Sequence, residues 1–492
     1  MDIKRKIDCE ILVVGGGNAG LVTTLEAKNA GADVLLIEKS PKAARGGNSR
    51  FSGGIYRFAS PKGTEDYLGL MEGATLPKGE IEVEPYLKDA FYNKVITLSE
   101  GFADQRFTEI FVERSFETVK WLKSEGLEWE FYPDTLHKKG DKLFGPAGAT
   151  SMCAKGLGEG LVEMLYGIIE KKGVEVLYGT SARKLLINES GAVTGVIAKD
   201  VDGYFRIDAK NVILTCGGFQ ANPQMRRSFL GQNWDLVKLR GTRYNTGDGQ
   251  KMASEIGAHT AGHWGGCHAS IVSEDSPMVE AASAASERYA YNYGILVNRD
   301  GRRFVDEGED FIAFTYAKYG KEILKQPGSV AFQIYDAKTL HLLRFEYHNA
   351  EHVESDTLED LADQLDIDVD AFVKTVREYN EAAVDDRPFS SYRRDGLRTN
   401  GLTPDKTNWA QKIDTPPFHG YAVVCGLTMT YGGIRTNEKT QVIDTTGQPI
   451  PGLYAVGEIT GGFFYHNYPS GTGLVRGAVM GRIAAREAVA NR

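Results

Sequence analysis

The feature that most constrains this chain is a complete βαβ pattern near its N-terminus. The apolar run Ile11–Val14 predicts a buried strand, residues Leu21–Asn29 have a helical pattern, and Val34–Ile37 predicts a second strand that ends at Glu38. Three glycines at G-x-G-x-x-G spacing separate the first strand from the helix: Gly15, Gly17 and Gly20. This order of strand, glycine turn, helix, strand and acid indicates a dinucleotide-binding unit.

The three glycines have separate physical roles in such a unit. Gly15 permits the tight turn, Gly17 lets the backbone approach a pyrophosphate, and Gly20 lets the helix pack closely on the strand. The start of the helix then offers unpaired N–H groups and the positive end of its dipole to the phosphates. Glu38 is placed to accept hydrogen bonds from ribose hydroxyls and disfavours a 2′-phosphate, so we expect FAD or NAD rather than NADP.

Composition excludes several other classes. The 492-residue chain has a net charge of −9 and no basic stripe, which argues against nucleic-acid binding. Its five cysteines are scattered and form no C-x-x-C pair, so we expect a reducing compartment and no disulfide framework, zinc site or iron–sulfur cluster. The charged N-terminus leads directly into the first strand, and no apolar run is long enough to span a membrane. We therefore expect a cytoplasmic protein without a bound metal.

The order of predicted elements indicates an α/β fold with a discontinuous Rossmann-like FAD-binding domain and an inserted α+β cap domain. We expect the strands and hairpin around residues 175–218 to join the sheet of the βαβ unit after a helical segment. Short strands and an amphipathic helix follow in the middle of the chain. After Pro416 the text is strand-like again and ends in a helix rich in small residues. We predict domain segments 1–266 and 417–492 for the cofactor and 267–416 for the cap.

Four further glycine-containing segments favour FAD over NAD. Two glycine pairs follow the second strand, in Arg45–Ser49 and Ser52–Gly54, and suit a long flat ligand. A strand ends at Thr215–Gly218, an acid follows a strand in Leu453–Glu458, and Ser470–Leu474 opens the last helix, whose dipole suits negative charge on a reduced isoalloxazine ring. Because only one complete fingerprint is present, we expect the flavin to exchange electrons with the organic substrate or with a separate protein, not with NAD(P)H in a second Rossmann domain.

The predicted cofactor-binding residues come from these segments. They are Gly15, Gly17, Asn18, Ala19, Gly20, Glu38, Lys39, Arg45, Gly46, Gly47, Asn48, Ser49, Ser52, Gly53, Gly54, Ala182, Thr215, Gly217, Asp248, Gly457, Glu458, Gly473 and Leu474.

With these motifs, the chain resembles the flavoprotein family of succinate dehydrogenase and fumarate reductase over nearly its whole length. The text that carries the resemblance is NTGDG (245–249), GILVNRDGRRFVDE (294–307), Tyr379-Asn380 and LYAVGEITGG (453–462). RGGNSR, GCHA, FTYAKYG, DGLRTNGL, NWAQKIDTPPF and NYPSGTGL make it most similar to the tricarballylate dehydrogenase group, and the last segment also resembles a loop of 3-ketosteroid dehydrogenases.

The resemblance implies FAD in the nucleotide domain, a substrate held between flavin and a mobile cap, and hydrogen transfer across a C–C bond beside a carboxyl or carbonyl group. Gly47 falls near the place of the family's flavin-linking histidine, which implies non-covalent FAD. We expect the desaturation of a small polycarboxylate, tricarballylate-like to aconitate-like, with electrons passed to a separate accepting protein.

The resemblance also assigns the substrate end of the site. His268 matches the family's substrate-binding histidine within a residue, and Tyr468 lies in the loop that faces the substrate over the flavin. The predicted catalytic residues are His268, Tyr316 and Tyr468, and the predicted substrate-binding residues are His268, Arg393, Arg394, Thr428, Thr430 and Tyr468. A guanidinium fork suits a carboxylate, which is why the two arginines are included.

The chain departs from fumarate reductases at two places. No arginine follows the RFVDE text, where those enzymes have their proton-shuttling arginine, and Leu427–Tyr431 stands where one of their carboxylate-binding histidines precedes the glycine pair. Tyr316 or Tyr319, with Lys318 as a nearby cation, is the replacement proton relay that the sequence offers. The alternatives are a 3-ketosteroid-type dehydrogenase, a fumarate-type reductase, and a flavin-binding redox module without turnover.

Overall fold

The first sheet of the protein is built around β1 (Lys6–Val14). The computed structural model describes residues 3, 5–281 and 283–492 and has the predicted βαβ unit: β1 pairs in parallel with β2 (Val34–Glu38), and α1 (Asn18–Asn29) connects them. The helix begins at Asn18, earlier than the expected Leu21, because the residues directly after the glycine turn already have helical conformation. The last four residues of β1 are buried, as expected for a strand covered on both faces.

This sheet has eight strands among the described residues, in the order β10-β11-β12-β1-β2-β9, with β20 beside β12 and β19 beside β20. The remaining strands are β9 (Glu175–Tyr178), β10 (Ser181–Ile187), β11 (Val193–Asp200), β12 (Gly203–Leu214), β19 (Gln441–Ile443) and β20 (Pro449–Ala455). β11 and β12 form the predicted hairpin, and β20 returns from far along the chain to pair in parallel with β12. The first sheet is therefore discontinuous in sequence, as predicted.

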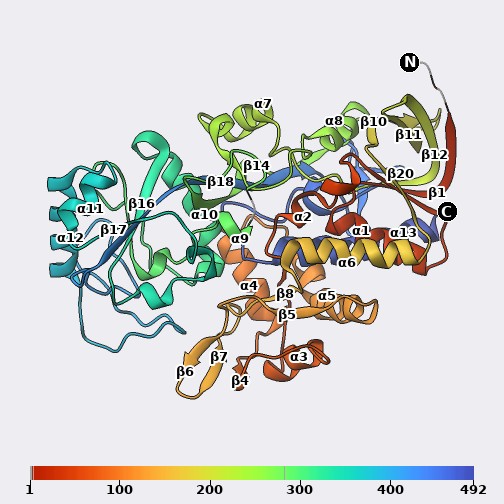
Figure 1. Ribbon diagram of the computed structural model, residues 1–492. Helices are drawn as coiled ribbons and strands as arrows, with labels where there is room; N and C mark the ends of the chain where they lie inside the picture. Colours follow the sequence, from red (N-terminus) through yellow and green to blue (C-terminus); the bar gives the residue numbers. More distant parts are fainter. Residues whose placement is uncertain (1–2, 4, 282) are drawn as a thin grey trace.

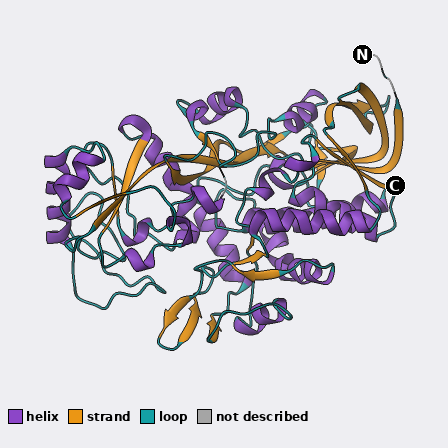
Figure 2. Ribbon diagram, viewed as in Figure 1, coloured by secondary structure: helices purple, strands orange, loops and turns teal. Residues whose placement is uncertain are grey.

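A group of helices packs beside this sheet, as Figures 1 and 2 show. They are α1, α5 (Gln105–Ser124), α6 (Leu157–Lys171) and α13 (Thr472–Ala490). Small residues let α1 and α13 approach closely: a Cβ at Gly481 would lie 2.7 Å from Thr23 Oγ1, and one at Gly477 would lie 3.4 Å from Ala19 Cβ. The small residues of the last helix thus allow close packing of α13 against α1.

The second sheet, on the left of Figure 1, is dominated by two long antiparallel strands, β14 (Thr260–Ser273) and β18 (Phe418–Ile434). Its other strands are β13 (Lys238–Leu239), β15 (Ile295–Val297), β16 (Val330–Tyr335) and β17 (Val353–Ser355). Helix α10 (Ile312–Leu324) packs on β14 and β18, and α11 (Leu358–Gln364) and α12 (Val369–Ala382) lie at the far end.

Residues 55–154 form two small sheets with helices around them, drawn at the bottom of Figure 1. The first sheet contains β3 (Ile55–Tyr56), β5 (Trp129–Phe131) and β8 (Met152–Ala154), and the second contains β4 (Glu80–Val83), β6 (His137–Lys139) and β7 (Lys142–Gly145). The remaining α-helices of four or more residues are α2 (Gly47–Arg50), α3 (Thr64–Leu70), α4 (Lys88–Leu98), α8 (Asp248–Glu255) and α9 (Ser283–Ser286). The short α7 (Pro223–Met225) continues into a π-helix at Arg226–Leu230.

The α/β fold with a second, inserted α+β unit is confirmed, and the predicted domain segments stay a prediction. The predicted boundary between residues 266 and 267 falls inside β14, and β18, which follows residue 417, belongs to the second sheet. In the described residues, no helix is long and apolar enough to cross a membrane.

Candidate active site

A cavity of about 740 Å³ opens where the parallel strands of the first sheet end. Its lining includes Val14, Glu38 and Thr215, at or just after the carboxyl ends of β1, β2 and β12. Open α/β sheets bind ligands at this edge, and ligand pockets have volumes of roughly 300–1,000 Å³. The cavity is thus in the place, and of the size, that a dinucleotide-binding fold predicts.

The glycine turn shows which glycines the protein itself requires. Gly15 has φ of 110°, and a Cβ at Gly20 would lie 1.9 Å from the carbonyl oxygen of Gly15, so α1 packs directly on the turn. Gly17 is different, because a Cβ there would make only ordinary contacts, 3.6 Å from Ser49 Oγ and 3.7 Å from Gly46 O. The space in front of Gly17 therefore fits a ligand that approaches the backbone.

The start of α1 has the electrostatics of an anion site. Its N-cap is Gly17, which has no side chain to cap the helix, and its first turn carries no acidic residue. Asn18 N–H donates to Ser49 Oγ at 3.0 Å, which ties the helix to α2. The positive end of the dipole therefore faces the cavity, and the first turn of the helix itself carries no carboxylate that would neutralise it.

Glu38 and Lys39 line the cavity beside this helix. The Glu38 carboxylate accepts hydrogen bonds from the backbone N–H groups of Gly16 and Ser40, both at 2.7 Å, and these contacts fix its orientation. Lys39 Nζ lies 2.7 Å from Asp248 Oδ2, so β2 is joined to α8 across the rim. The expected contact of Glu38 with ribose hydroxyls stays a prediction.

The start of α13 closes the other side of the cavity. Gly473 N–H donates to Tyr468 Oη at 2.8 Å, and Asn18 Nδ2 donates to Leu474 O at 2.8 Å, which links the two glycine-led helices. Glu458 is half-buried nearby, lines the cavity and accepts from Thr430 N–H at 3.0 Å. Burial raises the pKa of Glu458 to about 7.

Most of the predicted cofactor residues line the cavity. They are Gly15, Gly17, Asn18, Ala19, Glu38, Lys39, Gly47, Asn48, Ser49, Ser52, Gly53, Ala182, Thr215, Gly217, Asp248, Gly457, Glu458, Gly473 and Leu474. The predicted residues outside the lining are Gly20, Arg45, Gly46 and Gly54.

These four residues build the walls rather than face the cavity. Arg45 pairs with Glu163 at 2.6 Å and Glu170 at 2.7 Å, and its guanidinium stacks on Tyr166. A Cβ at Gly46 would lie 2.5 Å from the Val162 side chain. The glycines therefore permit close packing, and Arg45 forms ion pairs with α6, while its role in cofactor binding stays a prediction.

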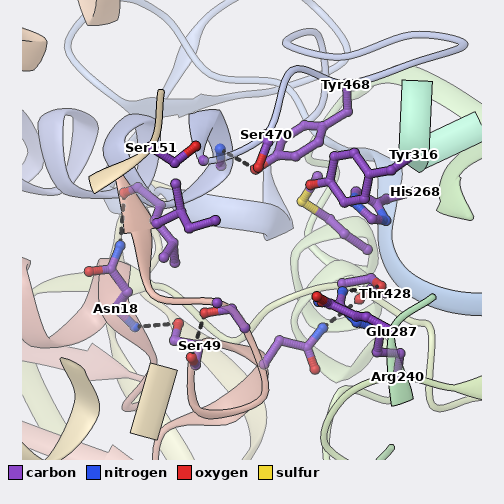
Figure 3. A pocket seen from close by; sticks show the side chains of 18 of the residues that line it. Asn18, Ser49, Ser151, Arg240, His268, Glu287, Tyr316, Thr428, Tyr468 and Ser470 are labelled. Carbon is purple, nitrogen blue, oxygen red and sulfur yellow. Dashed lines mark hydrogen bonds and ion pairs between the residues drawn. The ribbon is translucent and has the colours of Figure 1, made fainter. Parts of the chain in front are cut away.

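His268, Tyr316 and Tyr468 come together at the substrate end of the cavity, as Figure 3 shows. The His268 ring meets the Tyr316 and Tyr468 rings edge-on, with centroids 4.8 and 5.1 Å apart. They come from β14, α10 and the loop before α13, three segments far apart in the sequence. Asn18 and Ser49 lie on the opposite side of the same cavity.

All three side chains are uncharged at neutral pH. Burial and the nearby Arg240 lower the pKa of His268 to about 3, and its Nδ1 has no hydrogen-bond partner among the described residues. Burial raises the pKa of Tyr316 well above its usual value and also raises that of Tyr468. The group therefore consists of neutral hydrogen-bond donors and acceptors rather than a histidine cation.

The sequence analysis missed two arginines that line this end. Arg240, only 5% exposed, forms an ion pair with Glu287 and donates to Thr428 Oγ1 at 2.8 Å. Arg344 also lines the cavity and lies 3.0 Å from Glu346. No spacing could have found them, because Arg240, Glu287 and Arg344 belong to three separate segments.

The predicted carboxylate clamp lies elsewhere. Arg393 and Arg394 do not line the cavity, and the Arg394 side chain is 58% exposed with its guanidinium 3.9 Å from Asp310. Thr428 lines the cavity as predicted. Thr430 does not line it, and its backbone N–H donates a hydrogen bond to Glu458. Both arginines are exposed, so their charges are solvated, and their role in substrate binding stays a prediction.

The predicted alternative proton relay is also separated by the fold. Tyr319 donates to the backbone carbonyl of Asp306 and does not line the cavity. Lys318 pairs with Glu309, so it does not lower the pKa of Tyr316. Of the two tyrosines on α10, only Tyr316 faces the site.

A group with potential metal ligands lies on the second sheet outside the cavity lining. His352, Glu354 and His419 place ligand atoms within 4.8 Å of one another. No sequence pattern predicts this group, because the three residues come from two distant segments.

The residues present fit FAD. Two uncapped, glycine-led helix starts, an open approach to the Gly17 backbone and a long cavity match a pyrophosphate and an extended ring system. Gly47 offers no nucleophile at the place where the family's flavin-linking histidine was expected.

Comparison with known proteins agrees with this assignment. A family model described as "FAD binding domain" matches residues 10–474. A probable fumarate reductase of Shewanella frigidimarina is 30% identical over 485 residues, covering 97% of this chain and 74% of the relative. A vinyl phenol reductase of Lactiplantibacillus plantarum is 27% identical over 531 residues, covering 99% and 98% of the two chains. The open conformation of a flavocytochrome c3 fumarate reductase superposes with a TM-score of 0.72 at 27% identity, covering 99% of this chain and 78% of that structure.

Proposed function

Because the chain belongs to the FAD binding domain family and is an FAD-dependent oxidoreductase of the CH–CH class, we propose that it transfers hydrogen across a carbon–carbon bond next to the carboxyl group of a small organic acid. The observation that carries the proposal is the shared cavity. It joins the glycine cradle of α1 to two buried phenols, a neutral imidazole and Arg240. Arginine and histidine at this end favour an acid over a neutral ketone.

The protonation states favour reduction of a double bond over desaturation. When bound, the reduced flavin supplies a hydride equivalent. A buried phenol at neutral pH holds its proton, so Tyr316 is in the state needed to give a proton to the neighbouring carbon. Desaturation would require a base, which at Tyr316 would be its phenolate. Lys318 forms an ion pair with Glu309 and therefore does not stabilise a phenolate at Tyr316.

Tyr468 and the start of α13 have a different task. Because Gly473 N–H donates to Tyr468 Oη, the phenol proton is left for an acceptor in the cavity. A carbonyl or carboxylate oxygen held there gains electron density as hydride adds to the conjugated double bond. The positive end of α13 stabilises that charge.

Tricarballylate desaturation stays a prediction within this proposal, as do non-covalent FAD, a separate electron-transfer protein and a cytoplasmic location. Desaturation of tricarballylate would be the reverse reaction in the same cavity. It would need groups that bind three carboxylates. The ketosteroid alternative draws support from the Tyr468–Gly473 pair, which suits a ketone oxygen as well as a carboxylate.

The test is an anaerobic single-turnover measurement. Enzyme with reduced flavin is mixed with fumarate, aconitate, acrylate, cinnamate or 4-androstene-3,17-dione, and reoxidation of the flavin is followed. We expect reoxidation by unsaturated acids, and a Tyr316→Phe variant that is slower by about 10²–10⁴-fold with unchanged flavin content. Tyr319→Phe, on the same helix but outside the cavity lining, is the matched control.

If oxygen reoxidises the flavin but none of these compounds does, the proposed reaction is refuted, and a flavin module without turnover becomes the better account. Reoxidation by the ketone alone would favour the ketosteroid alternative. Equal rates in wild type and Tyr316→Phe would remove Tyr316 from proton transfer.

A further inference from the structure

The substrate end of the cavity has an apolar wall that the reaction chemistry does not require. Phe311, Leu342, Leu343 and Phe389 are half-buried and line the cavity. From behind they pack against a buried aromatic cluster: the Phe311 ring lies 5.7 Å from the Trp409 ring, for example. Their remaining surface faces the cavity, where an apolar ligand group would cover it.

The charges at this end offer little attraction for a substrate with several carboxylates. Arg240 is paired with Glu287, and Arg344 with Glu346. His268 is neutral because burial and Arg240 lower its pKa. Arg240 and Arg344 thus already face carboxylates of the protein. Arg476, which also lines the cavity and is 3% exposed, forms no ion pair with a carboxylate in the described part of the chain, so it is the interior cation left for one substrate carboxylate. A second or third substrate carboxylate would be buried without its own cation.

The other cations nearby do not change this balance. Lys138 lines the cavity but is exposed at its mouth, and Arg393 and Arg394 are exposed outside the lining. Solvated charges of this kind contribute little to holding an anion in the interior. The described residues therefore accommodate about one substrate carboxylate and a sizeable apolar group.

We propose that the substrate is an aryl-substituted α,β-unsaturated monocarboxylate, with its ring seated on the wall formed by Phe311, Leu342, Leu343 and Phe389. The inference rests on the proposed function and names its substrate class. The double bond gains a hydride from the reduced flavin at the ring-bearing carbon and a proton from Tyr316 at the carbon next to the carboxylate. The substrate is thereby reduced by two electrons to the saturated acid, and the flavin is oxidised.

The first test compares acids that differ in ring and charge. Cinnamate carries a ring and one carboxylate, acrylate one carboxylate without a ring, fumarate two carboxylates and cis-aconitate three. We expect cinnamate to reoxidise the reduced flavin with a kcat/KM at least about tenfold above each of the others. Its saturated product, 3-phenylpropanoate, is expected to perturb the absorbance of the oxidised flavin on binding, which measures affinity without turnover.

The second test removes part of the wall. Phe389→Ala should weaken 3-phenylpropanoate binding and raise the KM for cinnamate by about tenfold, with little effect on the KM for acrylate. Phe102→Ala is the matched control, because that ring is 62% exposed and lies outside the cavity lining. Leu343→Ala tests the same wall should Phe389→Ala not fold.

The outcomes separate this inference from the proposed function. If fumarate or cis-aconitate reoxidises the flavin faster than cinnamate, the aryl assignment is overturned and hydrogen transfer to an unsaturated acid stands. If no unsaturated acid reacts, both fail. If cinnamate reacts but both wall variants keep the wild-type KM and affinity, the placement of the ring is overturned.

Discussion

Replacing Gly17 with valine separates the needs of the cofactor from the needs of the fold. Gly17 has φ of −79°, which any residue adopts, and a Cβ there would meet nothing closer than 3.6 Å. The free energy of unfolding of the cofactor-free protein should therefore change by less than about 1 kcal/mol. A valine side chain would instead project into the space that the backbone leaves open for a pyrophosphate.

The cost to binding follows from hydrogen-bond distances. N–H donors must lie about 2.9 Å from a phosphate oxygen, and a valine methyl group keeps that oxygen at roughly 3.5 Å or more from the backbone. Each hydrogen bond to a charged group contributes about 1.5–3 kcal/mol. Losing two of them weakens FAD binding by about 3–6 kcal/mol, which is roughly a 10²–10⁴-fold increase in Kd.

The measurement is FAD content per protein after purification, followed by titration of the stripped protein with FAD. The control is Gly20→Ala, whose Cβ would lie 1.9 Å from Gly15 O and should destabilise the folded protein itself. We expect Gly17→Val to be folded but colourless and Gly20→Ala to lose thermal stability. A Gly17→Val protein with wild-type FAD affinity would refute the placement of the pyrophosphate at α1.

Three other predictions concern the same site. The purified protein should release its flavin on acid precipitation, since Gly47 offers no side chain for a covalent link; flavin in the pellet would contradict this. His268→Ala should leave FAD content intact but raise substrate KM by about tenfold, whereas unchanged kinetics would place His268 outside the substrate site. In the cofactor-free protein, the pKa of Glu458 is raised from 4.5 to about 7. The unfolded chain therefore loses this proton at a lower pH than the folded protein does. As a result, the free energy of unfolding falls as pH rises between these two values, by up to about 3 kcal/mol. Glu458→Gln should remove that part of the decline in thermal stability, and identical pH profiles would show that the pKa of Glu458 is not raised in the folded protein.

The pattern of Ile11–Glu38 determined the fold class because it is local. A buried strand, a glycine turn and a helix follow one another within one stretch of chain, and each position has its own requirement for φ, size or polarity. Gly15 and Gly20 show such requirements directly, in a positive φ and a close helix contact. The glycine segments around Ser49, Gly217 and Gly473 also line the cavity. They could be recognised from the sequence because they are short turns after strands or before helices.

The substrate end was decided by tertiary structure. Arg240, Glu287 and Thr428 are separated by more than forty residues at each step. The pairing of β13 with β18 brings Arg240 beside Thr428, and a bridge between Glu287 and β14 brings Glu287 to the same place. The sequence pointed instead to Arg393 and Arg394, since a cluster of arginines looks the same whether its loop faces a cavity or water.

Protonation and shape at the site depend on burial, which no local pattern contains. Desolvation keeps His268 neutral and Tyr316 protonated, and packing against Trp409 makes Phe311 part of a wall rather than of the core. The sequence alone determined that a flavin-type dinucleotide has a cradle at α1. The tertiary structure decided which charges, rings and protons face that cradle, because those depend on side chains from segments that meet only in the folded chain.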